Sequence, residues 1–283
     1  ALVAATGGTV PGHFVITLPK ITHPEQVTVL ADVLDELERS LGLDAGAIPI
    51  ELMIETTLSV IGPDGTCALP ALLAAARGRC TGAHFGTYDY TADCGITAAH
   101  QHMTHPACDF ARNLMQVACA GTGVFLSDGA TNIMPVGPHK PGRDGAALTP
   151  EHEAENRASV HAAWHLHVAH IRHSLSRGFY QGWDLHPAQL PTRYAAVYDF
   201  FLRGLDAAST RLSNFVAKAA QATLVGDVFD DAATGQGLLN FFIRGINCGA
   251  LSEDEALATG LSLEELRGRS FAAILDNRRA GRS

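Results

Sequence analysis

Short apolar runs alternate with helical patterns along the first two thirds of this chain, and this alternation limits the possible folds more than any other feature. Turn-forming residues or a proline follow most of the runs. The expected strands are His13–Leu18, Ile48–Ile54, Thr81–Phe85, Gly123–Leu126 and Phe179–Leu185. Strands that are separated by helices form βα units, which pair into a mostly parallel sheet through right-handed crossovers. The pattern therefore predicts an α/β fold.

The first helical pattern has clear start and stop signals. Thr22-His23-Pro24-Glu25 is a capping-box arrangement with proline near the first helical position, and Gly42 is a typical helix end. Further helices are expected over Ala68–Arg77, Pro106–Ala118 and Pro150–Arg177. After Pro191 the chain has a helical pattern throughout, with helices expected over Thr192–Thr223, Gly235–Arg244 and Leu263–Asp276.

The charge and the apolar content exclude several classes of function. The chain has 20 basic against 29 acidic residues, a net charge of −9, and no basic block, so a nucleic acid is not an expected partner. No apolar run approaches the roughly 18 residues of a spanning helix, so a membrane is not expected either. The opening ALVAATGGTVPG does not have the pattern of a signal peptide. Without a C-x-x-C pair, the 6 cysteines are expected to be reduced thiols in a cytoplasmic protein.

Polar side chains follow the expected strands at their carboxyl ends, where the sites of parallel α/β folds lie. They are Lys20, Glu55, Asp89, Asp128, Asp184 and His186. Glu55 and Asp89 come from adjacent strands and suit Mg²⁺, which usually takes one or two protein carboxylates and keeps several waters. The alternative is that these carboxylates only pair with Lys20 or cap the next helix.

Five motifs in order resemble the last five βα units of the citrate lyase beta-subunit and 2-oxo-diacid aldolase superfamily, which is the phosphoenolpyruvate/pyruvate-binding type of barrel. They are LPK at 18–20, IET at 54–56, FGTYDYTADCGI at 85–96, LSDG at 126–129 and GFYQGWDLHPAQLP at 178–191. GTYDYTAD and GFYQGWDLHPAQLPTRY are similar, more narrowly, to an uncharacterised aldolase or citrate-lyase-like branch. Some members of that branch carry a phosphoenolpyruvate kinase label.

The resemblance implies a (β/α)8 TIM barrel of which this chain holds strands four to eight. Residues 1–191 would then form the barrel portion, and 192–283 the last barrel helix and a C-terminal helical extension. Strands one to three would be missing, together with the arginine that binds the substrate carboxylate in the family. We therefore expect the sequence to be truncated at its N-terminus. Relatives are commonly trimers or hexamers, so a homo-oligomer is expected.

The resemblance also implies the site. Glu55 and Asp89 fall on the family's ligands for Mg²⁺, a site where Mn²⁺ can also be considered. Backbone amides of the turn Gly86-Thr87-Tyr88-Asp89 would hold oxygens of a small carboxylate substrate. Apart from the resemblance, Asp128 is expected either to contact the substrate or a metal-bound water or only to cap the turn. Lys20 is expected to pair with a carboxylate or, less simply, to act as a Schiff-base amine.

The leading functional hypothesis is a Mg²⁺-dependent carbon–carbon lyase or aldolase. It would act on a 2-oxo acid or a related carboxylate, including an acyl-CoA thioester, through a metal-stabilised enolate. Phosphoenolpyruvate-dependent phosphotransfer would reuse the same ion and enolate site. The third hypothesis, from a different class, is a truncated and non-catalytic barrel that binds a carboxylate or a partner subunit.

Several other polar residues have both a functional and a structural interpretation. His100, His102 and His105 suggest zinc, but no fourth ligand is evident, so histidines that stabilise a loop are the simpler expectation. Glu51 shares a strand face with Glu55, so it would support the metal site or Lys20, or form a buried ion pair. Asp184 and His186 suit either acid–base groups or a turn at the rim.

Three longer segments remain open to two interpretations each. Segment 128–149 is expected to be a lid or a plain surface loop. The histidines between 161 and 173 suit an outer helix of mixed exposure, because only His161 and His165 clearly share a face. The apolar and aromatic stripe of the helix after Pro191 suits core or subunit contact; it contains Tyr194, Val197, Tyr198, Phe201, Leu202 and Leu205.

Overall fold

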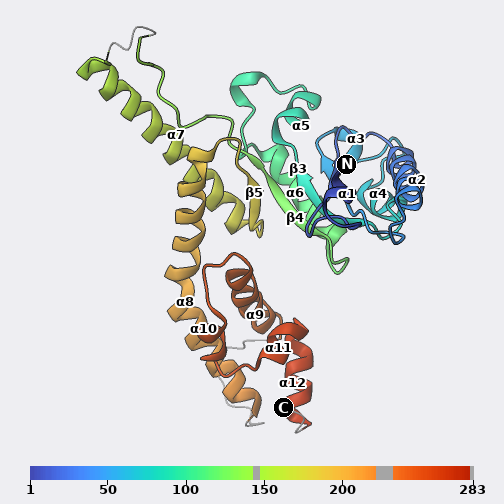
Figure 1. The fold of residues 1–283 in the computed structure, drawn as a ribbon. Helices are drawn as coiled ribbons and strands as arrows, with labels where there is room; N and C mark the ends of the chain where they lie inside the picture. The colour runs from blue at the N-terminus through green and yellow to red at the C-terminus, as the bar shows by residue number, and fades with distance from the viewer. Residues whose placement is uncertain (143–146, 221–231, 281–283) are drawn as a thin grey trace. The chain divides into compact units, whose positions relative to one another are not determined.

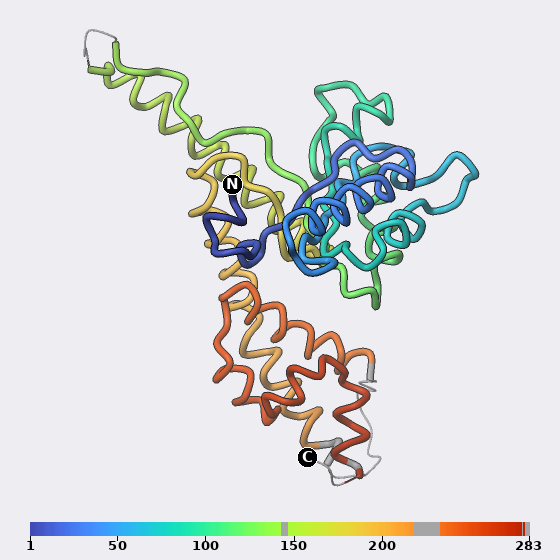
Figure 2. Tube along the Cα trace, turned by 45° about the vertical axis from the view of Figure 1, so that its right-hand side comes forward, coloured from blue at the N-terminus to red at the C-terminus, as the bar shows by residue number. Residues whose placement is uncertain are grey.

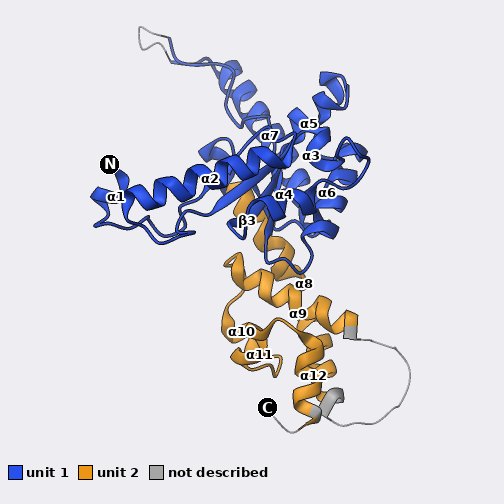
Figure 3. Cartoon of the chain, turned by 90° about the vertical axis from the view of Figure 1, so that its right-hand side faces the viewer, with its two compact units in different colours: residues 1–190 blue, residues 191–283 orange. Residues whose placement is uncertain are grey.

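The computed structural model describes residues 1–142, 147–220 and 232–280. Contacts between residues divide the chain into two compact units, Ala1–Leu190 and Pro191–Ser283 (Figure 3). None of the helices formed by the described residues combines the length and the apolar character that a membrane crossing needs.

The first unit is built on a five-stranded sheet (Figure 1). Its strands are β1 Ile16–Leu18, β2 Ile50–Ile54, β3 Cys80–Phe85, β4 Phe125–Ala130 and β5 Gln181–Trp183. Each strand pairs in parallel with the next one along the chain, so the order is β1-β2-β3-β4-β5. This confirms the α/β class with a parallel sheet. Within the described residues, β1 and β5 form the two edges of the sheet.

The first unit also contains helices, most of which connect these strands. They are α1 Leu2–Ala5, α2 Pro24–Leu41, α3 Thr57–Val60, α4 Leu69–Ala75, α5 Thr87–Asp93, α6 Pro106–Cys119 and α7 Pro150–Ser176, with the 3₁₀ turns η1 Ala98–His100 and η2 Pro187–Gln189. At the start of α2, the side chain of Gln26 accepts from the N–H of His23 at 3.0 Å. Gln26 therefore closes the capping box, and the expectation of Glu25 in that role is wrong.

The two faces of the sheet differ in chemistry because side chains alternate along each strand. Ile50, Leu52 and Ile54 of β2 are buried in an apolar cluster with residues of α2, α4 and α6. Glu51 points to the other face, where it contacts His84 of β3. Burial of a large aliphatic side chain contributes about 1.5–3 kcal/mol, so the helix-covered face stabilises the unit. The opposite face carries the polar groups.

Three differences from the expected elements have local causes. β4 runs from Phe125 to Ala130, so Asp128 lies inside this strand and not beyond its end. The helix expected over Leu263–Asp276 is split because Arg269 adopts a left-handed conformation with φ 55°. The short helices α3 and α5, which lie directly after β2 and β3, were not expected.

The second unit is helical (Figure 2). Its helices are α8 Leu190–Ala220, α9 Ala232–Asn247, α10 Glu253–Leu257, α11 Leu263–Gly268 and α12 Phe271–Arg279. The last residues of the expected helix 192–223 lie outside the described residues. The stripe on α8 is only partly core: Val197 and Phe201 are buried, whereas Tyr194, Tyr198 and Leu202 are exposed. Glu265 and Arg278 form a two-pronged ion pair at 2.6 and 2.7 Å between α11 and α12.

A buried ion pair links α2 to the start of β3. Glu38 is 1% exposed, and its two oxygens accept from Nη1 and Nη2 of Arg79, both at 2.7 Å. The same carboxylate accepts the N–H groups of Gly46 and Ile48. The hydrogen bonds with Arg79 lower the pKa of Glu38 to about 2.

Glu38→Gln should lower the free energy of unfolding by about 3 kcal/mol, because the buried Arg79 guanidinium then keeps only the partly exposed carboxylate of Asp35 as an ionic partner. Because the pKa of Glu38 is lower in the folded than in the unfolded state, its ionised carboxylate stabilises the protein above about pH 4.3. This stabilisation is lost as the pH falls towards 2. Urea unfolding between pH 7 and 3 measures both effects. Glu36→Gln, which removes an exposed pair with Arg39 on the same helix, should change stability by less than about 1 kcal/mol. Equal losses in the two variants would contradict this account.

Candidate functional site

The carboxyl ends of β1, β2 and β3 bring Lys20, Glu55 and Asp89 together. Lys20 follows β1, Glu55 directly follows β2, and Asp89 lies in the first turn of α5 after β3. Lys20 Nζ forms an ion pair with Asp89 Oδ1 and lies 3.9 Å from Glu55 Oε2. Two carboxylates from neighbouring strands thus face one ammonium group.

The backbone of Lys20 also belongs to this site. Its N–H donates to Glu55 Oε1 at 2.8 Å. Lys20 has φ 54°, a left-handed conformation that costs a residue other than glycine about 1–3 kcal/mol. This conformation is part of the geometry in which the amide contacts the glutamate, so Glu55 has one oxygen fixed by the main chain and the other near the ammonium.

Gly86 provides the space for Glu55. A Cβ at position 86 would lie 2.4 Å from Glu55 Cβ and 2.8 Å from Glu55 Oε2. The N–H of Gly86 donates to Ile54 O at 2.9 Å, within the main-chain pairing that continues from the sheet. The Gly86 amide thus already has a main-chain acceptor, which leaves the amides of Thr87 and Tyr88 for the expected contact with substrate oxygens.

Burial makes the two carboxylates unequal. Glu55 is 6% exposed, whereas the Asp89 side chain is 54% exposed. Loss of solvent raises the pKa of Glu55, the Lys20 amide and charge oppose that rise, and Asp89 adds to it. The hydrogen bond with Asp89 raises the pKa of Lys20. The site therefore combines one buried and one solvent-facing carboxylate.

These groups fit a hard divalent cation. Carboxylate oxygens are the donors that Mg²⁺ and Mn²⁺ prefer, and two of them converge on one positive charge here. In the described part of the chain, no group of three or more His, Cys, Asp or Glu residues is arranged to hold a metal. A two-carboxylate site suits Mg²⁺, which keeps several waters, but not zinc, which takes three or four protein ligands.

The histidines proposed for zinc have local partners. His102 Nδ1 lies 3.1 Å from the Thr104 hydroxyl, and His105 Nδ1 accepts from the N–H of Ala107 at the start of α6. For His102 and His105, these contacts favour loop stabilisation.

Thr87 and Tyr88 connect α5 to β4 and the loop after it. The Tyr88 hydroxyl donates to Ala130 O at 2.8 Å and accepts from the N–H of Asn132 at 3.0 Å. Thr87 is 1% exposed, and its hydroxyl has no hydrogen-bond partner among the described residues. The absence of a side chain at Gly129 makes room for it, since a Cβ there would lie 2.4 Å from Thr87 Oγ1. The Thr87 hydroxyl is therefore an unused donor at this end of the sheet. Leaving such a buried hydroxyl unpaired costs about 1–3 kcal/mol, which a ligand that accepts its hydrogen bond would recover.

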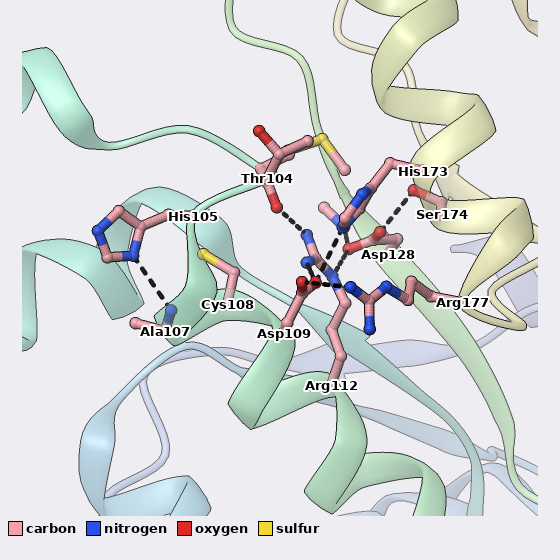
Figure 4. Close-up of polar contacts among 12 residues, drawn as sticks. Thr104, His105, Ala107, Cys108, Asp109, Arg112, Asp128, His173, Ser174 and Arg177 are labelled. Carbon is pink, nitrogen blue, oxygen red and sulfur yellow. Dashed lines mark hydrogen bonds and ion pairs between the residues drawn. The ribbon is translucent and has the colours of Figure 1, made fainter.

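Asp128 does not face the site. Its Oδ1 accepts from Arg112 Nε and from the N–H of Gly129, both at 2.7 Å, and its Oδ2 accepts from the Ser174 hydroxyl at 2.5 Å (Figure 4). Asp128 and Arg112 are each 1% exposed. These contacts favour a structural role for Asp128 over the expected role in substrate or water binding. Strand alternation inside β4 turns this residue towards α6 and α7.

Glu51 and His84 form a second polar pair on the sheet face that Glu51 shares with Glu55. Glu51 Oε2 lies 2.5 Å from His84 Nε2, and the Trp183 indole N–H donates to His84 Nδ1 at 2.8 Å. An indole nitrogen only donates, so Nδ1 is the acceptor and the His84 proton lies on Nε2, towards Glu51. Glu51 thus pairs with His84 and not with Lys20. Strand alternation could have placed His84 on this face, but its partner Trp183 is too distant in sequence to be found that way.

The rim residues and the expected lid have structural contacts. Asp184 Oδ1 lies 2.9 Å from His167 Nε2, and His186 Nδ1 accepts from the N–H of Ala188 in η2. In segment 128–149, His139 and Asn156 of α7 exchange two hydrogen bonds, at 2.9 and 3.0 Å. Residues 143–146 of that segment lie outside the described residues.

Asp128→Asn should lower the free energy of unfolding by about 3 kcal/mol, since it breaks a buried ion pair but leaves Asp109 beside Arg112. Asp44→Asn, at an exposed turn, should change stability by less than about 0.5 kcal/mol. Chemical denaturation of both variants measures the difference. An Asp128→Asn protein as stable as the parent would contradict a structural role for this carboxylate.

Comparison with solved structures finds similar chains. RipC from Yersinia pestis has 20% identity and a TM-score of 0.41, and the match covers 67% of this chain and 65% of RipC. Malate synthase from Haloferax volcanii in a lead(II) complex has 15% identity and a TM-score of 0.44, with 94% of this chain and 68% of that chain covered. The magnesium/glyoxylate complex of the same enzyme has 16% identity and a TM-score of 0.43, with 94% of this chain and 66% of that chain covered. The chain thus spans about two thirds of the length of each.

Comparison with curated proteins finds no match. Residues 1–274 match a family that is described as a domain of unknown function, DUF6986. Because this match covers nearly the whole sequence, the chain belongs to the DUF6986 family.

Proposed function

We propose that this chain carries the metal and enolate site of a carbon–carbon lyase or aldolase that acts on a 2-oxo acid or a related carboxylate, including an acyl-CoA thioester. The observation that carries the proposal is the convergence of Glu55 and Asp89 on one positive charge at the carboxyl ends of adjacent parallel strands. Anionic ligands that are polarised by a divalent cation suit such a centre.

The proposed fold is a (β/α)8 barrel to which β1–β5 contribute consecutive strands. Two features support it. The strands pair in sequence order and in parallel, as barrel strands do. The face opposite the helices carries Glu51 and His84, which would point into the barrel interior.

In this proposal each residue has a separate task. Glu55 and Asp89 hold Mg²⁺ or Mn²⁺, and the Lys20 amide keeps Glu55 in place. Amides in the first turn of α5, at Thr87 and Tyr88, have no acceptor within their helix and bind substrate oxygens. The Thr87 hydroxyl is a further donor at the same end of the sheet. When bound, the ion supplies Lewis-acid stabilisation of the enolate charge that forms as the carbon–carbon bond breaks.

Mg²⁺ and oxalate together should raise the thermal stability of the chain by more than the sum of their separate effects, because oxalate has the two oxygens of an enolate-like fragment. A ligand at about 100 times its dissociation constant adds about 2.7 kcal/mol. Differential scanning fluorimetry of the parent and of Asp89→Ala measures this. The synergy should disappear in Asp89→Ala and persist in Asp44→Ala, the exposed control. Its absence in a cooperatively melting parent would contradict the proposed site.

Gly86→Ala should weaken Mg²⁺ binding and also lower the thermal stability of the protein, because the clash reaches Glu55 Cβ, next to the main chain. The new methyl group would occupy the space of Glu55 Cβ and Oε2 and would push the carboxylate away. Isothermal titration calorimetry with Mg²⁺ measures the loss. Gly12→Ala is the matched control, because a Cβ there meets no atom within 4 Å. Unchanged Mg²⁺ affinity in Gly86→Ala would show that the position of Glu55 does not matter for the ion.

A further inference from the structure

The Lys20 side chain occupies the space that a metal between Glu55 and Asp89 would need. Its ammonium is paired with Asp89 Oδ1 and lies 3.9 Å from Glu55 Oε2. The second oxygen of Glu55, Oε1, already accepts the Lys20 N–H at 2.8 Å. Glu55 Oε2 and the carboxylate of Asp89 therefore remain for a cation, and the Lys20 ammonium lies next to both of them.

An ammonium and a divalent ion exclude each other from this position. Two positive charges a few ångströms apart repel each other, and partial burial on the Glu55 side reduces solvent screening. Both cations would also compete for the same lone pairs. Glu55 and Asp89 can therefore bind either the Lys20 ammonium or a divalent ion, but not both at once.

The lysine can leave without dismantling the site. Its side chain is 59% exposed and has four rotatable bonds, so water can take up the ammonium. The contact that fixes Glu55 belongs to the main chain of Lys20 and does not depend on the side chain. Displacement therefore moves one flexible side chain and leaves Glu55 in place.

We propose that the Lys20 ammonium is a resident counter-ion: it holds Glu55 and Asp89 together in the metal-free protein and is displaced when a divalent cation binds. This inference rests on the proposed function, because it needs the same two carboxylates to bind the metal. Lys20 is in this sense a positioning residue that sets metal affinity, since each binding event must break the lysine's ion pairs.

Lys20→Met tests this inference because it removes the charge and keeps an unbranched side chain. Mn²⁺ binding to the full chain is measured from the free-ion signal in electron paramagnetic resonance, and Mg²⁺ binding by calorimetry, at fixed pH and ionic strength. We expect Lys20→Met to bind both ions about five- to tenfold more tightly than the parent. Lys140→Met removes the same charge from an exposed position and should leave affinity unchanged.

A second variant and a second readout separate the possible results. Lys20→Arg keeps the charge and should bind Mn²⁺ with affinity within about threefold of the parent. Metal-free Lys20→Met should melt at a lower temperature than the parent and gain more from saturating Mg²⁺. Equal or weaker metal binding by Lys20→Met, with binding by the parent intact, would overturn the counter-ion role alone. No metal binding by the parent or by any variant would overturn the proposed function as well.

Discussion

Side-chain alternation along β2 and β3 is the constraint on which the rest of the first unit depends. One set of positions, including Ile50, Leu52 and Ile54, completes the apolar core beneath the helices. The other set, including Glu51 and His84, is polar. Because Glu55 follows β2 in step with this alternation, the same geometry that buries the core directs a carboxylate to the opposite face. Core formation and site formation are thus consequences of one register.

The order of strands and helices could be predicted from the sequence, because it depends on local periodicity. The positions of Lys20, Glu55 and Asp89 after three strands could be predicted for the same reason. The place of Asp128 could not be predicted, because Asp-Gly in LSDG is typical of a turn. In the structure, β4 continues through these two residues to Ala130. The partners of Asp128, in α6 and α7, are contacts between distant segments that no local pattern indicates.

Main-chain conformation and main-chain hydrogen bonds were the other features that could not be predicted from the sequence. The family resemblance implied that the amides of Gly86, Thr87 and Tyr88 act alike, but the Gly86 amide pairs with Ile54 O. What distinguishes Gly86 is the space it leaves for Glu55. The split between α11 and α12 at Arg269 is similar, because it depends on one left-handed residue within an otherwise helical pattern. Such features depend on φ angles and close approaches, which residue types only constrain loosely.

Lys20 shows how one position can carry two separable tasks. Its amide orients Glu55, and this contact accompanies a left-handed backbone that glycine adopts without strain and that asparagine and aspartate tolerate. Its ammonium neutralises the carboxylates and depends on the side chain alone. Position 20 can therefore lose its charge during evolution without losing the geometry of Glu55. Glycine and asparagine are the residues that would keep this backbone conformation at position 20 while removing its positive charge.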